Sequence, residues 1–330
     1  MGYVKGIAAL TLGATFVLGG CSALNSADEE QGYELVDGKN GAKEIKLTEK
    51  ELERLEQVGK EYREKNYVPV QEYVGEGFRL EADNGTDAIA EKKREEVEQA
   101  VKKFFVDKYK TDVKVHNIVG TTGAASVFVE SVGEPHFYTL AIIPVDVKNE
   151  SVETDGVWSL EDEIEQAIVT GLLAMIYDEK LAVLDDYLET IVNEYPVTGQ
   201  KVEALGSVGA VKYATPYYRL SANMDSFQNL LAEYISNPER TKEEWKSFEE
   251  EINYDPEQFI IAIELFMSEK DLEPDEELID KIATDIKKME GLPRAKYGID
   301  LHDNFVDKMS GRGNKENSLE RGNPELIIKE

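Results

Sequence analysis

Cysteine is nearly absent from this chain. Cys21 is the only one in 330 residues, so no disulfide can form within the chain. The folded part must therefore be stabilised by its hydrophobic core or by bound metal. With 41% hydrophobic residues, the chain has enough apolar material for one or two packed domains.

Basic residues are scarce relative to acidic ones. The chain has 37 Lys and Arg against 67 Asp and Glu, which gives a formal net charge of −30. Proteins that bind nucleic acid gather Lys and Arg against phosphate, so no nucleic-acid partner is expected. The same charge argues against adhesion of the protein surface to anionic lipid headgroups.

An apolar stretch long enough to span a membrane is also missing from the N-terminus. The apolar run there, from Gly6 to Gly20, is shorter than the roughly 20 residues that a spanning helix needs. It follows one positive charge, Lys5, and ends in small residues, as secretory signal peptides do. A buried core helix is the alternative, but each glycine in the run would cost about 1 kcal/mol relative to Ala. We expect residues 1–20 to be a signal peptide.

Directly after this run, Cys21 completes the sequence Leu18-Gly19-Gly20-Cys21. This sequence resembles the lipobox of bacterial lipoproteins, in which the cysteine thiol receives a diacylglycerol before cleavage. The resemblance implies that Cys21 becomes the first mature residue and carries two or three fatty chains such as palmitate. At about 0.8 kcal/mol per buried CH₂, such chains hold a protein durably on a bilayer. The expected partner is the lipid bilayer, through acylated Cys21, and the expected location is the extracytoplasmic face of the cell membrane.

Composition and periodicity divide the remaining chain into four segments. Residues 21–47 are polar and poor in bulky apolar side chains, which is typical of a flexible tether. Residues 48–150 combine helical and β patterns and predict an α+β lobe. Residues 151–290 predict a mainly helical lobe, and residues 291–330 lose periodicity and predict a loosely structured tail.

The α+β fold class is read from residues 48–150. Thr48 and Glu51 have the spacing of a capping box and predict a helix to about residue 66. Asp87 can cap a second helix that runs to about residue 109. Short links with Gly and Pro then separate β-rich runs, which predicts an antiparallel three-strand meander with a helix packed on it. The runs are 113–121, 124–132 and 136–145.

The second half follows helical spacing almost to its end. Ser159 is the expected N-cap of the first of these helices, and Asn237-Pro238 and Asp255-Pro256 are start signals for later ones. The predicted helices are 159–177, 180–195, 223–236, 238–252, 256–269 and 275–289.

The sequence carries no catalytic motif. No H-E-x-x-H, G-x-S-x-G or G-x-x-x-x-G-K is present, so no catalytic residue, metal site or cofactor is predicted. His116 and His136 lie on neighbouring predicted strands and can approach each other, but zinc would need more ligands. Acid clusters leave two alternatives open: weak binding of divalent cations, and a hydrolase with paired carboxylates, which has no local sequence mark.

A cluster of tyrosines is the candidate for ligand binding. Tyr213, Tyr217 and Tyr218, together with Arg219, could line a groove for a glycan or peptide. The alternative for these side chains is packing in the core and along a strand edge.

The segment from Gly120 to Asp146 reads GTTGAASVFVESVGEPHFYTLAIIPVD. Together with the lipobox and the overall layout, it resembles a family of uncharacterised Gram-positive lipoproteins known only as a domain of unknown function. The resemblance covers most of the mature chain and implies a cell-surface lipoprotein, without any catalytic residue. The expected function is a membrane-anchored binding module for an envelope protein, peptide or glycan. A cell-envelope hydrolase and a cation-binding surface lipoprotein are the alternatives.

Overall fold

The computed structural model describes residues 33–37, 43–75, 84–207 and 212–330. The predicted signal peptide and the lipobox with Cys21 lie outside these residues. The chain divides into two compact units, Met1–Glu61 and Tyr62–Glu330, which are described separately. Among the described residues, no helix is both long and apolar enough to cross a membrane.

The first unit contains a β-hairpin and most of a helix. Strand β1 (Tyr33–Asp37) pairs antiparallel with β2 (Lys43–Leu47), and α1 (Glu49–Asn66) follows. The prediction of a flexible tether is therefore wrong for these two stretches, which place apolar residues on either side of a link that contains Gly38, Asn40 and Gly41. The Thr48 hydroxyl accepts a hydrogen bond from the Glu51 amide at 3.3 Å, as the capping prediction requires.

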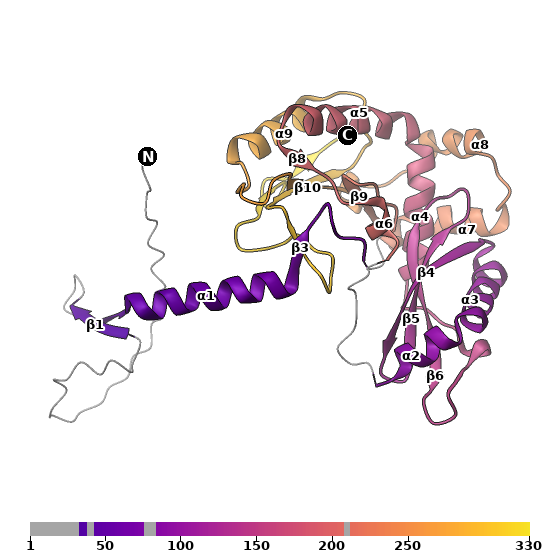
Figure 1. The fold of residues 1–330 in the computed structure, drawn as a ribbon. Coiled ribbons are helices and arrows are strands. Elements are labelled where there is room, and N and C mark those ends of the chain that lie inside the picture. Colours follow the sequence, from indigo (N-terminus) through magenta and orange to yellow (C-terminus); the bar gives the residue numbers. More distant parts are fainter. Residues whose placement is uncertain (1–32, 38–42, 76–83, 208–211) are drawn as a thin grey trace, which may run out of the picture. The chain divides into compact units, whose positions relative to one another are not determined.

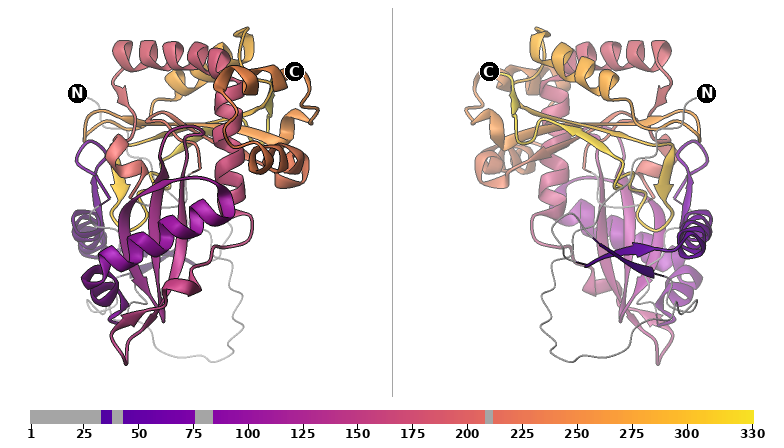
Figure 2. Two further views of the ribbon diagram at one scale, coloured as in Figure 1. Left: turned by 90° about the vertical axis from the view of Figure 1, so that its right-hand side faces the viewer. Right: turned by 90° about the vertical axis from the view of Figure 1, so that its left-hand side faces the viewer.

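The second unit contains a four-stranded antiparallel sheet of order β4-β5-β6-β7 in its N-terminal half. Gly123, at a φ of 71°, allows the tight turn between the first two strands. Figure 2 shows α3 lying across one face of this sheet. The strands are β4 (Val113–Thr121), β5 (Ala124–Ser131), β6 (Tyr138–Asp146) and β7 (Ser151–Val152), followed by a 3₁₀ turn at Thr154–Gly156.

The helix predicted from Asp87 to about residue 109 is two helices, α2 (Thr86–Lys92) and α3 (Arg94–Tyr109). The chain leaves helical geometry at Lys93, with φ −103° and ψ 20°. The side chain of Asp87 accepts a hydrogen bond from the Gly120 amide at 3.0 Å, so it ties α2 to the end of β4.

A second, six-stranded sheet occupies the C-terminal half (Figure 1). Its centre is a parallel pair, β10 (Phe259–Met267) and β11 (Lys296–His302), connected through α9 (Glu276–Lys288). The other strands pair antiparallel with these two. They are β8 (Val197–Thr198), β9 (Tyr218–Ala222), β13 (Leu319–Arg321) and β14 (Ile327–Ile328).

This sheet corrects one of the helices predicted for the second half. Residues 256–269, predicted as a helix, form a 3₁₀ turn and β10. Their apolar run does not distinguish a buried strand from a buried helix by periodicity, and pairing on both sides decides for the strand. The described part of the chain is a mixed α/β protein in which every strand pair except β10 with β11 is antiparallel.

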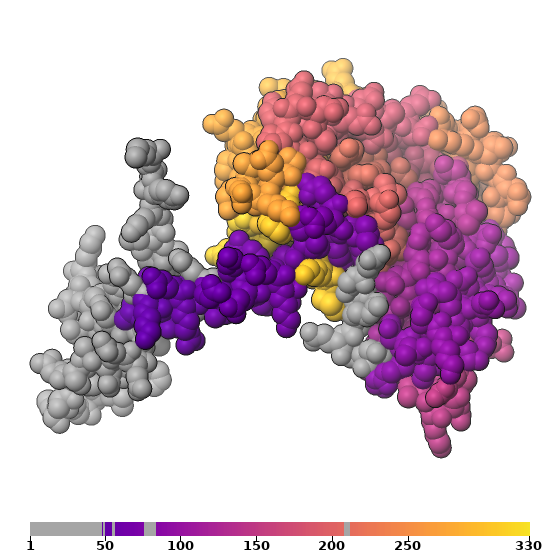
Figure 3. Space-filling view, in the orientation of Figure 1, coloured from indigo at the N-terminus to yellow at the C-terminus, as the bar shows by residue number. Residues whose placement is uncertain are grey.

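The prediction of a loosely structured tail at 291–330 is also wrong. This segment holds β11, β12 (Phe305–Asp307), β13 and β14. Gly291, Gly311 and Gly322 have positive φ angles and lie outside these strands. Strand β12 pairs with β3 (Tyr67–Pro69), and Figure 3 shows residues of the C-terminal part packed against this early segment.

Helix α4 (Glu163–Ile176) joins the two sheets, because it contacts β6 of one and β9 of the other. It begins at Glu163 with Asp162 as its N-cap, so the prediction that Ser159 caps it is wrong. Both sides of α4 are buried.

The remaining helices are α5 (Asp178–Glu194), α6 (Val202–Leu205), α7 (Met224–Ser236) and α8 (Lys242–Lys246), with a 3₁₀ turn at Ser247–Glu250. Helices α5 and α9 cover the six-stranded sheet (Figure 1).

Candidate functional site

The predicted tyrosine groove is divided between two faces of the six-stranded sheet. Tyr218 is 2% exposed and belongs to the hydrophobic core, where burial raises its pKa. Arg219, the next residue of β9, points to the opposite face and pairs with Glu264. Tyr213 and Tyr217 pack partly buried against the core, and burial raises the pKa of Tyr213 to about 12. The four side chains therefore do not line one groove.

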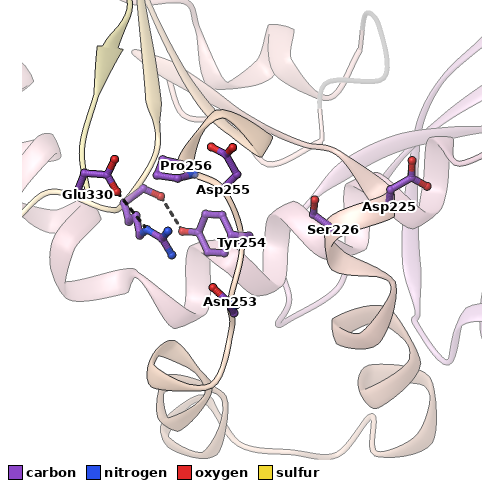
Figure 4. Close-up of a pocket in the computed structure, with 8 residues that line it drawn as sticks. Asp225, Ser226, Asn253, Tyr254, Asp255, Pro256 and Glu330 are labelled. Carbon is purple, nitrogen blue, oxygen red and sulfur yellow. Dashed lines mark hydrogen bonds and ion pairs between the residues drawn. The ribbon is translucent and has the colours of Figure 1, made fainter.

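A different set of residues surrounds an open pocket of about 680 Å³ (Figure 4). The start of α7 forms one wall, and the loop that leads into β10 forms another. The residues just before β11 and just after β14 complete it. The lining residues are Asp225, Ser226, Asn253, Tyr254, Asp255, Pro256, Arg294 and Glu330.

Tyr254 anchors the single arginine of this pocket. Its hydroxyl donates a hydrogen bond to the Arg294 carbonyl at 2.6 Å and lies 2.7 Å from the Tyr177 hydroxyl. The Arg294 guanidinium lies 5.2 Å from the centroid of the Tyr254 ring. Burial raises the pKa of Tyr254, so this phenol stays neutral and keeps its proton for the carbonyl. Arg294 is thereby fixed with its guanidinium one-third exposed and 4.0 Å from a Glu330 oxygen.

Two aspartates line the same pocket as this arginine, each at the beginning of a helical turn. Asp255 caps the turn that precedes β10, and its Oδ1 accepts a hydrogen bond from the Glu257 amide at 3.0 Å. Asp225 lies in the first turn of α7, after the N-cap Asn223. A guanidinium binds a ligand carboxylate, while aspartates bind an ammonium group. The pocket therefore has the chemistry to hold a small molecule that carries both charges.

The sequence did not single out this pocket, because its residues come from four distant segments. Asp255-Pro256 was visible only as a helix-start signal, which it is. Asp255 precedes the apolar run that forms β10, and the prediction of this run as a helix concealed its position at the start of a strand.

The two histidines expected to approach each other do converge, on one glutamate of β5. His116 Nε2 lies 2.8 Å from one oxygen of Glu130, and His136 Nε2 lies 3.9 Å from the other. The Tyr138 ring packs edge-on against His136, at 5.0 Å between centroids. Within the described ranges, no group of three or more His, Cys, Asp or Glu is placed to hold a metal ion. The structure therefore gives no support to the zinc alternative.

Comparison with known proteins identifies the family. Residues 60–329 match the family described as a protein of unknown function (DUF1672). A crystal structure of a DUF1672 family protein from Staphylococcus aureus subsp. aureus Mu50 is similar, at 18% identity and a TM-score of 0.65, over 80% of this chain and 98% of that chain. At this identity the similarity shows a shared fold only, and no curated protein matches. The expected membership of a family known only as a domain of unknown function is thus confirmed, and the chain belongs to the DUF1672 family.

Proposed function

We propose that this protein is a lipid-anchored lipoprotein of the extracytoplasmic membrane face whose Tyr62–Glu330 unit binds a short peptide or amino acid. The anchor is supported by the lipobox-like residues Leu18 to Cys21. The ligand class is supported by the pocket around Arg294, which is the observation that carries the proposal.

The composition of the pocket argues for a zwitterionic ligand. A purely cationic ligand would face Arg294, and a purely anionic one would face Asp225 and Asp255. A ligand with a free carboxylate and a free ammonium group can pair with both kinds of side chain. A volume of about 680 Å³ is within the range of small-molecule sites and is sufficient for a few residues of peptide.

Calorimetry with a tripeptide tests this proposal. The peptide with both termini free should bind saturably, and either N-acetylation or C-amidation should weaken it. Arg294→Gln should lower the affinity about tenfold or more, because a charge-assisted pair is lost. Arg321→Gln is the matched control, since Arg321 pairs with Asp280 and Glu276 outside the pocket. Equal affinity of wild type and Arg294→Gln, or no binding of any free peptide, would contradict the pocket assignment.

A further inference from the structure

Helix α1 leaves apolar side chains open to solvent along one face. Leu52, Val58 and Tyr62 are 44%, 52% and 60% exposed, although a surface helix usually buries its apolar stripe against a core. In the sequence, small and apolar residues recur here at intervals of three and four, as at the a and d positions of a coiled coil. These positions, which we call the α1 stripe, are Leu52, Leu55, Gly59 and Tyr62.

Both ends of α1 carry caps that hold the chain in helical geometry. At the start, the Thr48 hydroxyl accepts a hydrogen bond from the Glu51 amide at 3.3 Å. At the end, Lys308 Nζ donates to the carbonyls of Glu64 and Lys65 at 3.2 Å and 2.9 Å. A cation beside the last carbonyls of a helix satisfies them and suits the helix dipole. The α1 stripe therefore lies on a helix that is capped at both ends.

Charged residues on both sides of the α1 stripe change sign along the helix. On one side, Glu51 precedes Lys65 by two heptads, with Val58 midway between them. On the other side, Glu49 precedes Arg63 by the same interval. When two such helices pack antiparallel, each flank of one faces the same flank of the other in reverse order. The two acidic residues of each copy then meet the two basic residues of the other, and the two copies of Val58 meet at the centre.

These charges favour the antiparallel direction. It gives opposite-charge pairs at both ends of the α1 stripe and one like-charged pair, at position 56, near the centre. In a parallel pair, Glu51 would instead face position 56, which is also glutamate, and no acid would face a base. Within one chain, Glu51 lies 3.6 Å from the exposed Arg54, and such a pair contributes too little to prevent the exchange. The helix dipole also favours acids at the start and bases at the end of a helix, but it does not explain the exposed apolar residues between them.

We propose that two copies of this chain associate through the α1 stripe, with the two α1 helices antiparallel. A second copy fits because one helix supplies both the apolar line and flanking charges of both signs in the complementary order. The contact covers only about two heptads, and a net charge of −30 on each copy opposes it, so the dimer should depend on protein concentration. Copies held on one membrane face by the proposed anchor would have a raised local concentration, which favours such a contact.

Sedimentation equilibrium tests this surface, on the chain from residue 21 with Cys21→Ala. This chain keeps every residue that the structure describes and cannot form a disulfide between copies. At about 0.15 M salt, where exposed charges more than about 8 Å apart are largely screened, it should form a dimer whose fraction rises with concentration. Glu51→Lys and Lys65→Glu should each weaken self-association about tenfold, because two attractive pairs per dimer become repulsive. Glu53→Lys makes the same change of charge as Glu51→Lys at an exposed position away from the stripe, and should have little effect.

A mixture of Glu51→Lys and Lys65→Glu distinguishes paired helices from charge effects within one helix. In a mixed antiparallel dimer, the new lysine faces the new glutamate, and native Glu51 faces native Lys65. The mixture should therefore associate about as strongly as the chain without these substitutions. The helix dipole predicts no such recovery, because each substitution is unfavourable in its own helix.

Three results would overturn the proposal. One is a chain that stays monomeric at every concentration before either substitution is made, and another is a mixture that associates no better than each variant alone. The third is stronger self-association of Glu51→Lys, which would indicate a parallel pair. Leu52→Ser removes an exposed apolar side chain without changing the charge, and it should also weaken the dimer. Circular dichroism of each variant separates a lost contact from a lost helix.

Discussion

At the scale of single residues, Gly171 shows how closely α4 approaches its neighbours. A Cβ at this position would lie 2.7 Å from the His136 carbonyl oxygen and 3.0 Å from Pro135 Cβ. In an ordinary helix, Ala is about 1 kcal/mol more favourable than Gly. Here the contact is with backbone, so the substitution forces the helix and the loop before β6 apart.

We therefore predict that Gly171→Ala lowers the free energy of unfolding, by about 1–3 kcal/mol, as overpacking does in other cores. Urea unfolding followed by circular dichroism measures this change. Gly59→Ala in α1 is the matched control, because a Cβ there has nothing within 4 Å and should only favour the helix. Unchanged stability of Gly171→Ala would show that α4 and the loop at His136 are not in close contact.

The sequence predicted some of the contacts between polar side chains and missed others. The strand assignment predicted that His116 and His136 can approach each other. The structure confirms this and adds Glu130, which lies against both rings. Arg219 was singled out, but its partner Glu264 lies 45 residues away in a run predicted as a helix. The face to which a strand residue points depends on register, which a single sequence does not reveal.

At the scale of elements, long periodic helices were predictable and the C-terminal strands were not. The structure has α5, α7 and α9 within a few residues of the predicted ranges, because amphipathic spacing and caps specify such helices locally. Strand β11 pairs with β10 on one side and with β13 and β14 on the other, and these pairings specify it. Nothing local in the Gly- and Asn-rich segment marks these pairings, so the segment resembled a loose tail.

This correction yields a prediction for β11. Ile299 is 1% exposed and belongs to the main core, so Ile299→Ala should lower the free energy of unfolding by about 2–5 kcal/mol. Ile328→Ala, in the same C-terminal segment but 36% exposed, should cost much less. The urea midpoints of the two variants measure the difference. Equal and small effects would restore the interpretation of residues 291–330 as a tail.

At the scale of the whole molecule, composition sets limits that hold for any architecture. One cysteine excludes a disulfide within the chain, whatever the fold. The net charge of −30 argues against nucleic acid as a partner, and this stays a prediction. The pairing of segments as distant as β3 and β12 depends on the complete core. The proposed lipid anchor depends neither on the overall composition nor on the pairing of distant segments, because it is a short local sequence before the described fold.

The anchor can therefore be tested without disturbing the folded unit. We predict that Cys21→Ala moves the protein from the membrane fraction to the soluble fraction, because it removes the thiol that would carry the fatty chains. The intact mass of the wild-type membrane protein should equal that of the chain from Cys21 plus two or three acyl chains. Ser22→Ala leaves the thiol in place and should remain membrane-bound. Full retention of Cys21→Ala on membranes, or an unmodified thiol in the wild type, would disprove lipid anchoring while leaving the Arg294 pocket to its own test.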